Sequence, residues 1–333
     1  AAHVVDADEF DVLDLLTRLI DKSLVVTERS ESGETRYRML ETLRQFGLEL
    51  LSSSGRADTV RSRHLDHFFG WISSMRDDLR KPFPLEELQR IRGDMDNVRS
   101  ALTWGFREQP TPATEITKLL YPLWSFPGYY GEGRRWYQQI LDRGDTVEPA
   151  ERAHVLGRSA RLAFQQGDYA VDLALQKERA RICEALGDES RLARSLVLQG
   201  TAQAYMGHLD EAMPLYERAL ALYERLDDAT NIARAETSIG LVSFLKGDFE
   251  DARRRFEFSL RQARKDRHKD RVQVTLGNLA MVDVMQGRPS DAKRLIRQCM
   301  RTNEKVENLY GISHDLPALA VATRLEGDVT GAA

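Results

Sequence analysis

Residues 196–222 read LVLQGTAQAYMGHLDEAMPLYERALAL, and 40 residues further on the chain returns to the same pattern as ETSIGLVSFLKGDFEDARRRFEFSLRQ. Glycine marks one register five times, at Gly167, Gly207, Gly247, Gly287 and Gly327. Small residues keep a second register, at Ala160, Gly200, Gly240, Ala280 and Ala320. Large residues keep a third, at Gln176, Tyr216, Phe256 and Ile296. A fixed period between 20 and 50 residues is the signature of a solenoid.

Each repeat reads as a pair of helices. Apolar runs lie before and after every glycine, which ends the first helix in the left-handed conformation that glycine adopts at low cost. The Asp that often follows can cap the next helix. A small residue such as Gly200 lets the two helices approach, and an aromatic residue at 216 or 256 fills the space between neighbouring pairs. One pair cannot bury its apolar face alone, so the pairs must stack.

The marks at Gly200, Gly207, Ala212, Tyr216 and Ala219 resemble the ladder of the tetratricopeptide repeat (TPR). The usual period of that family is 34 residues, so a period of 40 implies longer helices. The first repeat departs from the ladder, at Asp172, Gln176 and Arg179. HEAT-like repeats have periods near 40 and are the alternative, but they lack the glycine and alanine ladder. We therefore predict a mainly α fold, a TPR-like α-solenoid of 40-residue hairpins over residues 147–333, with four full hairpins and a partial fifth.

The N-terminal part predicts a different fold. Apolar residues over 10–20 have helical spacing, residues 24–26 and 36–40 form two β-type runs around a turn within 28–35, and a helix is expected over 41–53. Helix, hairpin and helix are the back half of a winged helix. We predict a partial winged-helix domain with a small β-hairpin over 1–58. A helical connector is expected over 59–146, with breaks at 81–84, 109–112 and 126–128.

The segments 16–25 and 36–46 resemble the winged-helix module that follows the nucleotide-binding domain in bacterial STAND-type signalling NTPases. These are relatives of the NB-ARC class, and many are AfsR/SARP-like or LuxR-like transcriptional regulators. The segments 63–69, 96–104 and 123–136 resemble the helical connector of the same proteins. The resemblance implies that any ATPase chemistry, with its ATP or ADP, lies upstream. No cofactor is expected in this chain, and the NTPase domain is expected as an intramolecular partner of the winged helix.

The composition is that of an ordinary helical protein. The net charge is −4, with 42% hydrophobic and 30% charged residues, so nothing global favours nucleic acid or a membrane. The two cysteines, Cys183 and Cys299, read as core residues in a reducing compartment, which favours a cytoplasmic location. No apolar run approaches a membrane span of about 18 residues. The chain starts at Ala1 without a signal peptide or an initiator Met, so we expect a fragment of a longer protein.

No catalytic motif is found. The sequence lacks both a Gly-x-x-x-x-Gly-Lys-Ser/Thr phosphate loop and a Gly-x-Ser-x-Gly nucleophile elbow. His64 and His67 lie three residues apart but have no third ligand nearby, so no metal site is expected. We predict a protein without catalytic residues.

The first helices of a TPR array line its inner surface. Counting from the glycines predicts a partner-binding groove formed by Arg194, Thr201, Tyr205, Arg234, Thr237, Phe244, Asn278 and Met281, with Val197, Leu241, Gly277 and Met285 beside them. Cations at one edge and apolar, methionine-rich residues at the centre suit an extended peptide, or a helix with an acidic end. For Leu241, Met281 and Met285, a place in the core between repeats is the alternative.

A basic run lies on the second helix of the third repeat and the turn after it. It is formed by Arg253, Arg254, Arg255, Arg261, Arg264, Lys265, Arg267, Lys269 and Arg271, of which we single out Arg254, Arg261, Arg264 and Lys265 as a basic patch. A solvated outer face is one interpretation, and an acidic or nucleic-acid partner is the other.

The sequence therefore predicts the sensor and interaction region of a larger signalling NTPase that regulates transcription. It would bind a peptide, a protein or a small inducer. Direct contact of residues 1–58 with DNA is not expected, and neither is a membrane partner. Two alternatives remain open: a free-standing TPR scaffold, and a nucleic-acid binder that uses residues 253–271.

Overall fold

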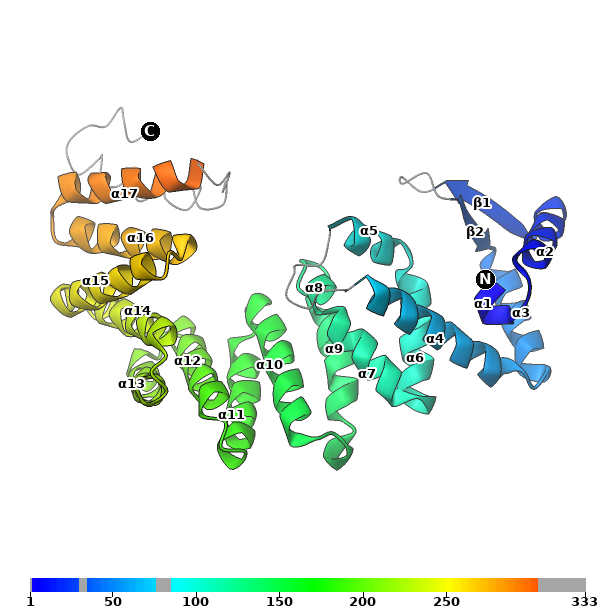
Figure 1. Cartoon of the computed structure of the whole chain (residues 1–333), viewed down its shortest axis with the longest axis horizontal. Helices are drawn as coiled ribbons and strands as arrows, with labels where there is room; N and C mark the ends of the chain where they lie inside the picture. Colours follow the sequence, from blue (N-terminus) through cyan, green and yellow to red (C-terminus); the bar gives the residue numbers. More distant parts are fainter. Residues whose placement is uncertain (1, 30–34, 76–84, 305–333) are drawn as a thin grey trace. The chain divides into compact units, whose positions relative to one another are not determined.

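The computed structural model describes residues 2–29, 35–75 and 85–304, and it divides into two compact units, 1–140 and 141–333 (Figure 1). Both units are built mainly from helices, and the strands found in the described residues form one two-stranded antiparallel sheet. The predicted fold class, a mainly α chain with a small β-hairpin ahead of a helical solenoid, is confirmed. The domain boundaries at 58/59 and 146/147 stay predictions.

The first unit begins with the predicted helix, hairpin and helix. Its elements are α1 Ala2–Val5, α2 Glu9–Asp21, β1 Val25–Arg29, β2 Thr35–Met39 and α3 Glu41–Ser53. Asp8 caps α2 by accepting a 2.8 Å hydrogen bond from the Phe10 N–H. The strands pair with Val25 opposite Met39 and Arg29 opposite Thr35. The centre of the predicted turn, residues 30–34, lies outside the described residues.

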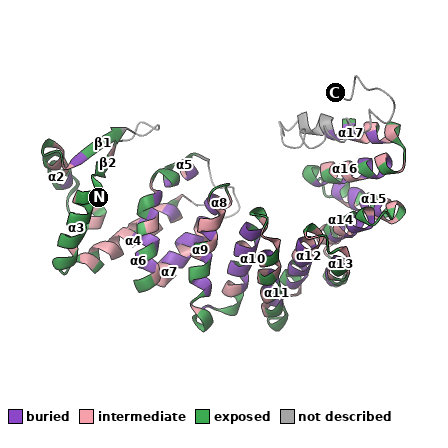
Figure 2. Cartoon of the chain, turned by 180° about the vertical axis from the view of Figure 1, so that it is seen from behind, coloured by how far each residue is buried: buried purple, intermediate pink, exposed green. Residues whose placement is uncertain are grey.

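This N-terminal segment buries little apolar surface. Among its described residues up to Arg56, only Val12 and Val25 are buried hydrophobic side chains. Phe10 is 81% exposed and Phe46 is 58% exposed, and Figure 2 shows α2 and α3 mostly in the colour of exposed residues. A fold of this size needs a larger buried core than the described chain provides.

The connector has a core of its own. Its helices are α4 Ala57–Ser74, α5 Leu85–Gly93, α6 Met95–Glu108, α7 Pro110–Leu119, α8 Tyr121–Trp124 and α9 Tyr130–Leu141. The helices α4, α6 and α7 pack on one another. Pro110 starts α7, and Gly128 has a φ of 93° before α9, so the predicted breaks near these residues are confirmed. The predicted break at 81–84 lies outside the described residues.

Two tryptophans of the connector pack within it. Trp124 is fully buried and donates a 3.0 Å hydrogen bond to the Thr117 carbonyl oxygen. Trp136 stacks on Phe106 with ring centroids 5.9 Å apart.

The second unit is a regular array of helical hairpins. After the short turn η1 Gly144–Thr146, its helices are α10 Pro149–Gln165, α11 Tyr169–Ala185, α12 Glu189–Tyr205, α13 Leu209–Arg225, α14 Ala229–Leu245, α15 Phe249–Lys265, α16 Lys269–Met285 and α17 Pro289–Glu304. The helices α10 to α16 each have 17 residues, and successive helices begin 20 residues apart. The 40-residue repeat is therefore two nearly equal halves. The partial fifth repeat, with Gly327, lies outside the described residues.

A single turn geometry joins all these helices. At the first turn Gly167 has a φ of 78°, and the N–H of Asp168 donates a 2.9 Å hydrogen bond to the Ala163 carbonyl oxygen. This is the Schellman arrangement. The same bond closes the other six turns, from Asp188, His208, Asp228, Asp248, His268 and Arg288, each to the carbonyl oxygen five residues earlier. The predicted Asp caps are present, since Asp168 and Asp248 accept from the N–H groups of Val171 and Asp251.

The turns between hairpins use the same geometry with less suitable residues. In the first turn between hairpins, the left-handed position is occupied by Gly187. In the next two such turns it is occupied by Asp227 and Arg267, with φ of 51° and 56°. The glycine ladder predicts only the turns inside hairpins. A left-handed conformation costs an ordinary residue about 1–2 kcal/mol.

Small residues allow the close packing of each hairpin, as predicted. A Cβ added to Gly200 would lie 2.8 Å from the ring of Tyr216, and one added to Gly240 would lie 2.8 Å from the ring of Phe256. Both rings are almost fully buried. The first helices of successive hairpins also contact each other, α12 with α14 and α14 with α16. These contacts place the first helices together on one face of the array, which we call the inner face.

The turn geometry leads to a matched pair of substitutions. Gly247→Ala should lower the free energy of unfolding by roughly 1 kcal/mol, because Gly247 has a φ of 84° and nothing lies near its Cβ position. Arg267→Gly should raise it by up to about 1 kcal/mol by relieving the same strain. Urea denaturation of the chain measures both. Arg267→Ala is the control, and a gain as large as that of the glycine variant would contradict the backbone explanation.

Candidate functional site

The inner face exposes a row of side chains from α12, α14 and α16. Arg194, Tyr205, Arg234, Leu241, Met281 and Met285 of the predicted groove are all exposed, while Thr201 and Asn278 are half-buried. Leu241 is 41% exposed, Met281 39% and Met285 55%. These three residues therefore lie on the surface and not in the core between repeats, which was the alternative.

Other groove candidates lie behind this row. Phe244 packs on Phe249, with ring centroids 5.6 Å apart, against the core cluster that contains Phe256. The Thr237 hydroxyl lies 2.7 Å from that of Ser259. The Thr201 hydroxyl accepts a 3.2 Å hydrogen bond from Tyr216. Val197 is half-buried and packs against the core clusters of its repeat. These side chains support the exposed row. Whether the inner face binds a partner stays a prediction.

Two exposed apolar residues were missed. Leu245 is 53% exposed and Val274 is 59% exposed, on the same face. The 40-residue register would have found them, because Leu245 lies between Tyr205 and Met285, and Val274 follows Arg234.

Aromatic contacts hold Tyr205 at the start of the row. Its ring centroid lies 5.0 Å from that of Phe164 and 5.1 Å from that of Tyr169. Phe164 and Tyr169 flank the turn between α10 and α11. The first hairpin therefore helps to position an exposed tyrosine of the second hairpin. Such pairs contribute about 0.5–1.5 kcal/mol beyond their burial.

The first hairpin replaces part of the apolar ladder by a buried polar network. Gln176 donates a 3.2 Å hydrogen bond to the Asp172 carboxylate and accepts one of 3.4 Å from Arg179. Gln199 of the next hairpin donates to the Gln176 carbonyl oxygen at 3.2 Å. Burial raises the pKa of Asp172 to about 6, although the hydrogen bond from Gln176 and the charge of Arg161 oppose the rise.

Part of the basic run is neutralised by ion pairs. Arg253 pairs with the buried Asp283, and the Nε of Arg288 lies 2.9 Å from that carboxylate. Arg254 pairs with Asp251. Arg255 contacts Asp251 and Glu236 at 2.7 Å each, and Arg271 lies 3.8 Å from Asp266.

The rest of the basic run is exposed. Arg261, Arg264, Lys265, Arg267 and Lys269 have no ion pair with a residue that the structure describes. Of the four residues of the predicted basic patch, Arg254 is thus paired, and Arg261, Arg264 and Lys265 lie open to solvent. The choice between a solvated face and a binding patch stays open for these three.

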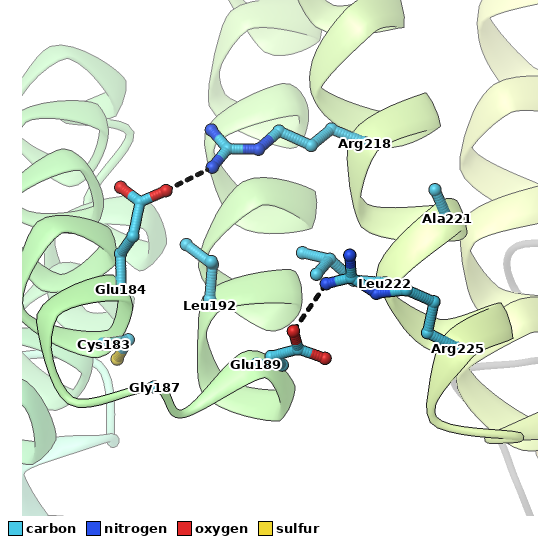
Figure 3. A pocket seen from close by; sticks show the side chains of 9 residues that line it. All are labelled: Cys183, Glu184, Gly187, Glu189, Leu192, Arg218, Ala221, Leu222 and Arg225. Atoms are coloured by element: carbon cyan, nitrogen blue, oxygen red, sulfur yellow. Dashed lines mark hydrogen bonds and ion pairs between the residues drawn. The ribbon is translucent and has the colours of Figure 1, made fainter.

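A pocket of about 440 Å³ lies where the end of α11, the start of α12 and α13 meet (Figure 3). Two ion pairs cross it, Arg218 to Glu184 at 2.7 Å and Arg225 to Glu189 at 2.6 Å. Leu192 and Leu222 contribute apolar surface. Because both arginines are already paired with carboxylates, we interpret this pocket as a structural crevice between hairpins.

Neither a metal cluster nor a membrane span is found in the part of the chain that the structure describes. No three His, Cys, Asp or Glu side chains there could hold a metal ion together. His64 and His67 lie on α4, where burial lowers the pKa of both. No helix among residues 2–29, 35–75 and 85–304 is long and apolar enough to cross a membrane.

Family models recognise both parts of the chain. Tetratricopeptide-repeat models match residues 200–226 and 231–305, and a winged helix-turn-helix model matches residues 1–52. The predicted winged helix and TPR array are confirmed.

The chain is similar to a longer mycobacterial protein. It is 31% identical over 253 residues to the "Putative HTH-type transcriptional regulator Rv0890c" of Mycobacterium tuberculosis, and equally to a Mycobacterium bovis counterpart. The match covers 73% of this chain and 28% of the relative, so the chain spans little more than a quarter of the curated relatives it matches.

Two solved structures share the fold. One is a Signal Transduction ATPase with Numerous Domains (STAND) protein with a tetratricopeptide repeat sensor from Pyrococcus horikoshii, with a TM-score of 0.55 and 13% identity, covering 99% of this chain and 52% of that one. The other is a Rap protein complexed with Competence and Sporulation Factor, with a TM-score of 0.51 and 13% identity, covering 82% and 94%.

These findings define the class of the protein as a winged helix-turn-helix domain joined to tetratricopeptide repeats. The predicted resemblance to the C-terminal part of STAND-type regulators is confirmed for this arrangement of domains. Tetratricopeptide repeats are a non-catalytic scaffold for interactions, and the exposed inner face is the surface that this scaffold presents.

The buried network of the first hairpin predicts a dependence on pH. Because the pKa of Asp172 in the folded chain, about 6, lies above its ordinary value of 3.8, its contribution to stability is complete below about pH 4 and is lost as the pH rises through 6. Asp172→Asn should remove this dependence and raise the free energy of unfolding at pH 7.5 by up to roughly 3 kcal/mol. Urea denaturation of both chains at pH 5 and 7.5 measures the free energy of unfolding and its dependence on pH.

The exposed Glu217→Gln is the control for this comparison. It should leave the difference between the two pH values unchanged. An Asp172→Asn chain that loses stability between pH 5 and 7.5 as much as the unaltered chain would contradict the assignment.

Proposed function

We propose that this chain is the sensor and interaction region of a multidomain STAND-type transcriptional regulator. It binds a protein, a peptide or a small inducer on the inner face of its repeats and thereby controls an upstream nucleotide-binding domain. The single observation that carries the proposal is the row of exposed apolar and cationic side chains on α12, α14 and α16. Such a face on a non-catalytic scaffold is suited to recognition.

The similar proteins support this proposal. The mycobacterial relatives are named as HTH-type transcriptional regulators, and the Pyrococcus protein is described as having a tetratricopeptide repeat sensor. The Rap protein was solved as a complex with Competence and Sporulation Factor. The Pyrococcus title names repeats of this kind, and the other two names refer to transcriptional regulation and to a bound factor.

The winged helix supports a second, intramolecular contact. The apolar side chains that the segment leaves exposed include Phe10, Leu13, Leu40, Phe46 and Leu50. A surface of this kind marks an interaction site. In the proposed regulator the nucleotide-binding domain covers it, and ATP or ADP binds in that domain and not in this chain. The regulator acts in the cytoplasm.

Control follows from differential affinity. A ligand on the inner face shifts the regulator between resting and active states only as far as it binds one state better than the other. The repeats form one continuous stack, so a ligand that spans several hairpins changes their relative packing. The domain that contacts the chain then responds to that change.

Two other functions stay open. A free-standing scaffold would have the same inner face but no upstream domain. Nucleic-acid binding is favoured by the exposed Arg261, Arg264, Lys265, Arg267 and Lys269. Charge reversal at Arg261 and Arg264 should then abolish a salt-dependent affinity for DNA or RNA, whereas the proposed function expects no such affinity.

The first test concerns the inner face of the full-length regulator. Leu241→Asp with Met281→Asp should abolish the response of a transcriptional reporter to its inducing condition, because two exposed apolar contacts become charged. Basal reporter activity should not change. Ala221→Asp with Phe258→Asp, at two exposed positions on second helices, is the matched control.

Two results would contradict the proposal. One is a full response from the Leu241 and Met281 variant with its helical circular dichroism intact. The other is a gene whose start codon lies just before Ala1, since the proposal requires an upstream phosphate loop of the form Gly-x-x-x-x-Gly-Lys-Ser/Thr. That second result would leave the scaffold function.

The second test concerns the winged-helix surface. Phe10→Ser with Phe46→Ser should make the 333-residue chain less prone to aggregate, because two large apolar side chains leave its surface. In the full-length regulator the same change should raise ATP hydrolysis in the absence of inducer several-fold, by loosening the contact. Unchanged hydrolysis in a folded variant would show that these residues do not contact the upstream domain.

A further inference from the structure

The inner face carries arginines that lack a carboxylate partner. Several arginines of the array are paired, such as Arg152 with Glu178 at 2.7 Å. By contrast, Arg179, Arg194 and Arg234 form no ion pair with any residue in the described ranges. Arg234 contacts only the Asn231 side chain, at 3.3 Å. Positive charge on this face is therefore left uncompensated.

Arg179 is the least expected of the three. It lies on α11 with only 8% of its surface exposed, where the other hairpins have Ala219, Ser259 and Cys299. Its Nε has no hydrogen-bond partner among the described residues, and its one hydrogen bond, to Gln176, is long at 3.4 Å. Burial lowers the pKa of Arg179, and the positive charges of Arg194 and Arg191 lower it further. A buried cation in such surroundings is stabilised by a bound anion.

The guanidinium of Arg179 reaches the inner helix of its own hairpin. It lies over Gly157 of α10, where an added Cβ would be 3.0 Å from the Arg179 Cζ. Position 157 has the register of Thr237, which was predicted to line the groove, and of Val197 and Gly277, which were predicted to lie beside it. The missing side chain at Gly157 makes room for the arginine. The first hairpin thus has a buried guanidinium at the register where the later hairpins have Val197, Thr237 and Gly277.

The nearby carboxylates already have partners. Asp188 caps α12 and pairs with Arg191 at 3.0 Å. Asp228 caps α14 and accepts a 2.6 Å hydrogen bond from the Asn231 amide. Neither has an ion pair with Arg179, Arg194 or Arg234. An anion from outside the chain is the group that this set of donors would accept.

The character of the inner face changes across the helices. Arg194 and Arg234 lie in the first halves of α12 and α14, whereas Leu241, Leu245, Met281 and Met285 lie in the second halves of α14 and α16. A nucleic acid would need cations along its whole path. A polypeptide with acidic residues at one end and large apolar residues at the other matches both halves.

We propose that the exposed Arg194 and Arg234, next to the unpaired charge of the buried Arg179, bind the carboxylates of an acidic protein segment whose apolar residues lie on α14 and α16. This rests on the proposed function and names the chemistry of the partner. The guanidiniums form charge-assisted hydrogen bonds with the carboxylates. The segment is oriented by charge, because its acidic residues are attracted to the side of the face where Arg194 and Arg234 lie.

Synthetic peptides test the proposal on the 333-residue chain. The probe is a fluorescein-labelled peptide of six glutamates followed by Leu-Leu-Met-Phe-Leu, compared with the same peptide carrying glutamine for glutamate. Fluorescence anisotropy at low salt should show the acidic peptide binding at least 10-fold more tightly. Arg194→Gln with Arg234→Gln should remove that preference. Arg261→Gln with Arg264→Gln, which removes two exposed cations outside the inner face, should leave it intact.

Arg179→Met distinguishes binding from a structural role. The substitution should raise the melting temperature of the free chain, because it removes an unpaired buried charge. It should also lower the affinity for the acidic peptide several-fold. A binding role predicts these opposite changes, whereas a purely structural arginine would lower the melting temperature. Circular dichroism verifies that each variant is folded.

Three outcomes would overturn the proposal. The first is equal affinity for both peptides, and the second is no binding of the acidic peptide. The third is that the Arg261 and Arg264 variant loses the preference for the acidic peptide as fully as the Arg194 and Arg234 variant. A single-stranded dT12 probe that binds through Arg261 and Arg264 would assign the positive charge to nucleic acid. The reporter response of the Leu241 and Met281 variant is measured separately, so the inner face can be functional even where the arginine proposal fails.

Discussion

One backbone hydrogen bond sets the geometry of the array. At each turn, the N–H after the left-handed residue donates to the carbonyl oxygen five residues earlier, as from Asp168 to Ala163. The bond ends every helix at the same point and starts the next after three residues. Because seven turns share it, 17-residue helices follow one another at 20-residue steps. Side-chain packing then operates on a backbone whose register is already fixed.

That register explains why a functional surface can arise from single residues. A position on one first helix faces the same way on the next, so Tyr205, Leu245 and Met285 form one exposed row although each stands 40 residues from its neighbour. Gly200 and Gly240 keep the paired helices close by leaving room for Tyr216 and Phe256. The core is therefore made by the repeated residues, whereas exposed positions of the inner face can vary between repeats, as where Val274 takes the place of Arg194 and Arg234.

The repeated residues are also what the sequence could predict. The glycine and alanine registers predicted the hairpins, and alternating and helical patterns predicted the winged-helix hairpin and α3. The turns at Asp227 and Arg267 escaped prediction, because there the hydrogen-bond pattern imposes a left-handed conformation on residues that seldom adopt it. Spacing alone could not tell the exposed Leu241 from the half-buried Phe244, since residues three apart lie on the same side of a helix. In the sequence, Arg179 could be recognised only as a departure from the TPR ladder. Its contact with Gly157 depends on tertiary packing and could not be predicted.

The polar interior of the first hairpin has a consequence for how the array comes apart. The stability of a solenoid is close to the sum of its repeats and of the interfaces between them. The interfaces of the later hairpins contain Phe256, Ile239 and Leu279. The interface of the first hairpin adds the polar network of Asp172, Gln176 and Arg179 to an apolar cluster that includes Cys183, Leu192 and Leu196. Polar groups exchange their hydrogen bonds with water on opening, whereas apolar surfaces lose their burial. Separation of α10 and α11 from α12 therefore exposes polar groups together with apolar surface, so the free energy of this opening depends on the protonation of Asp172.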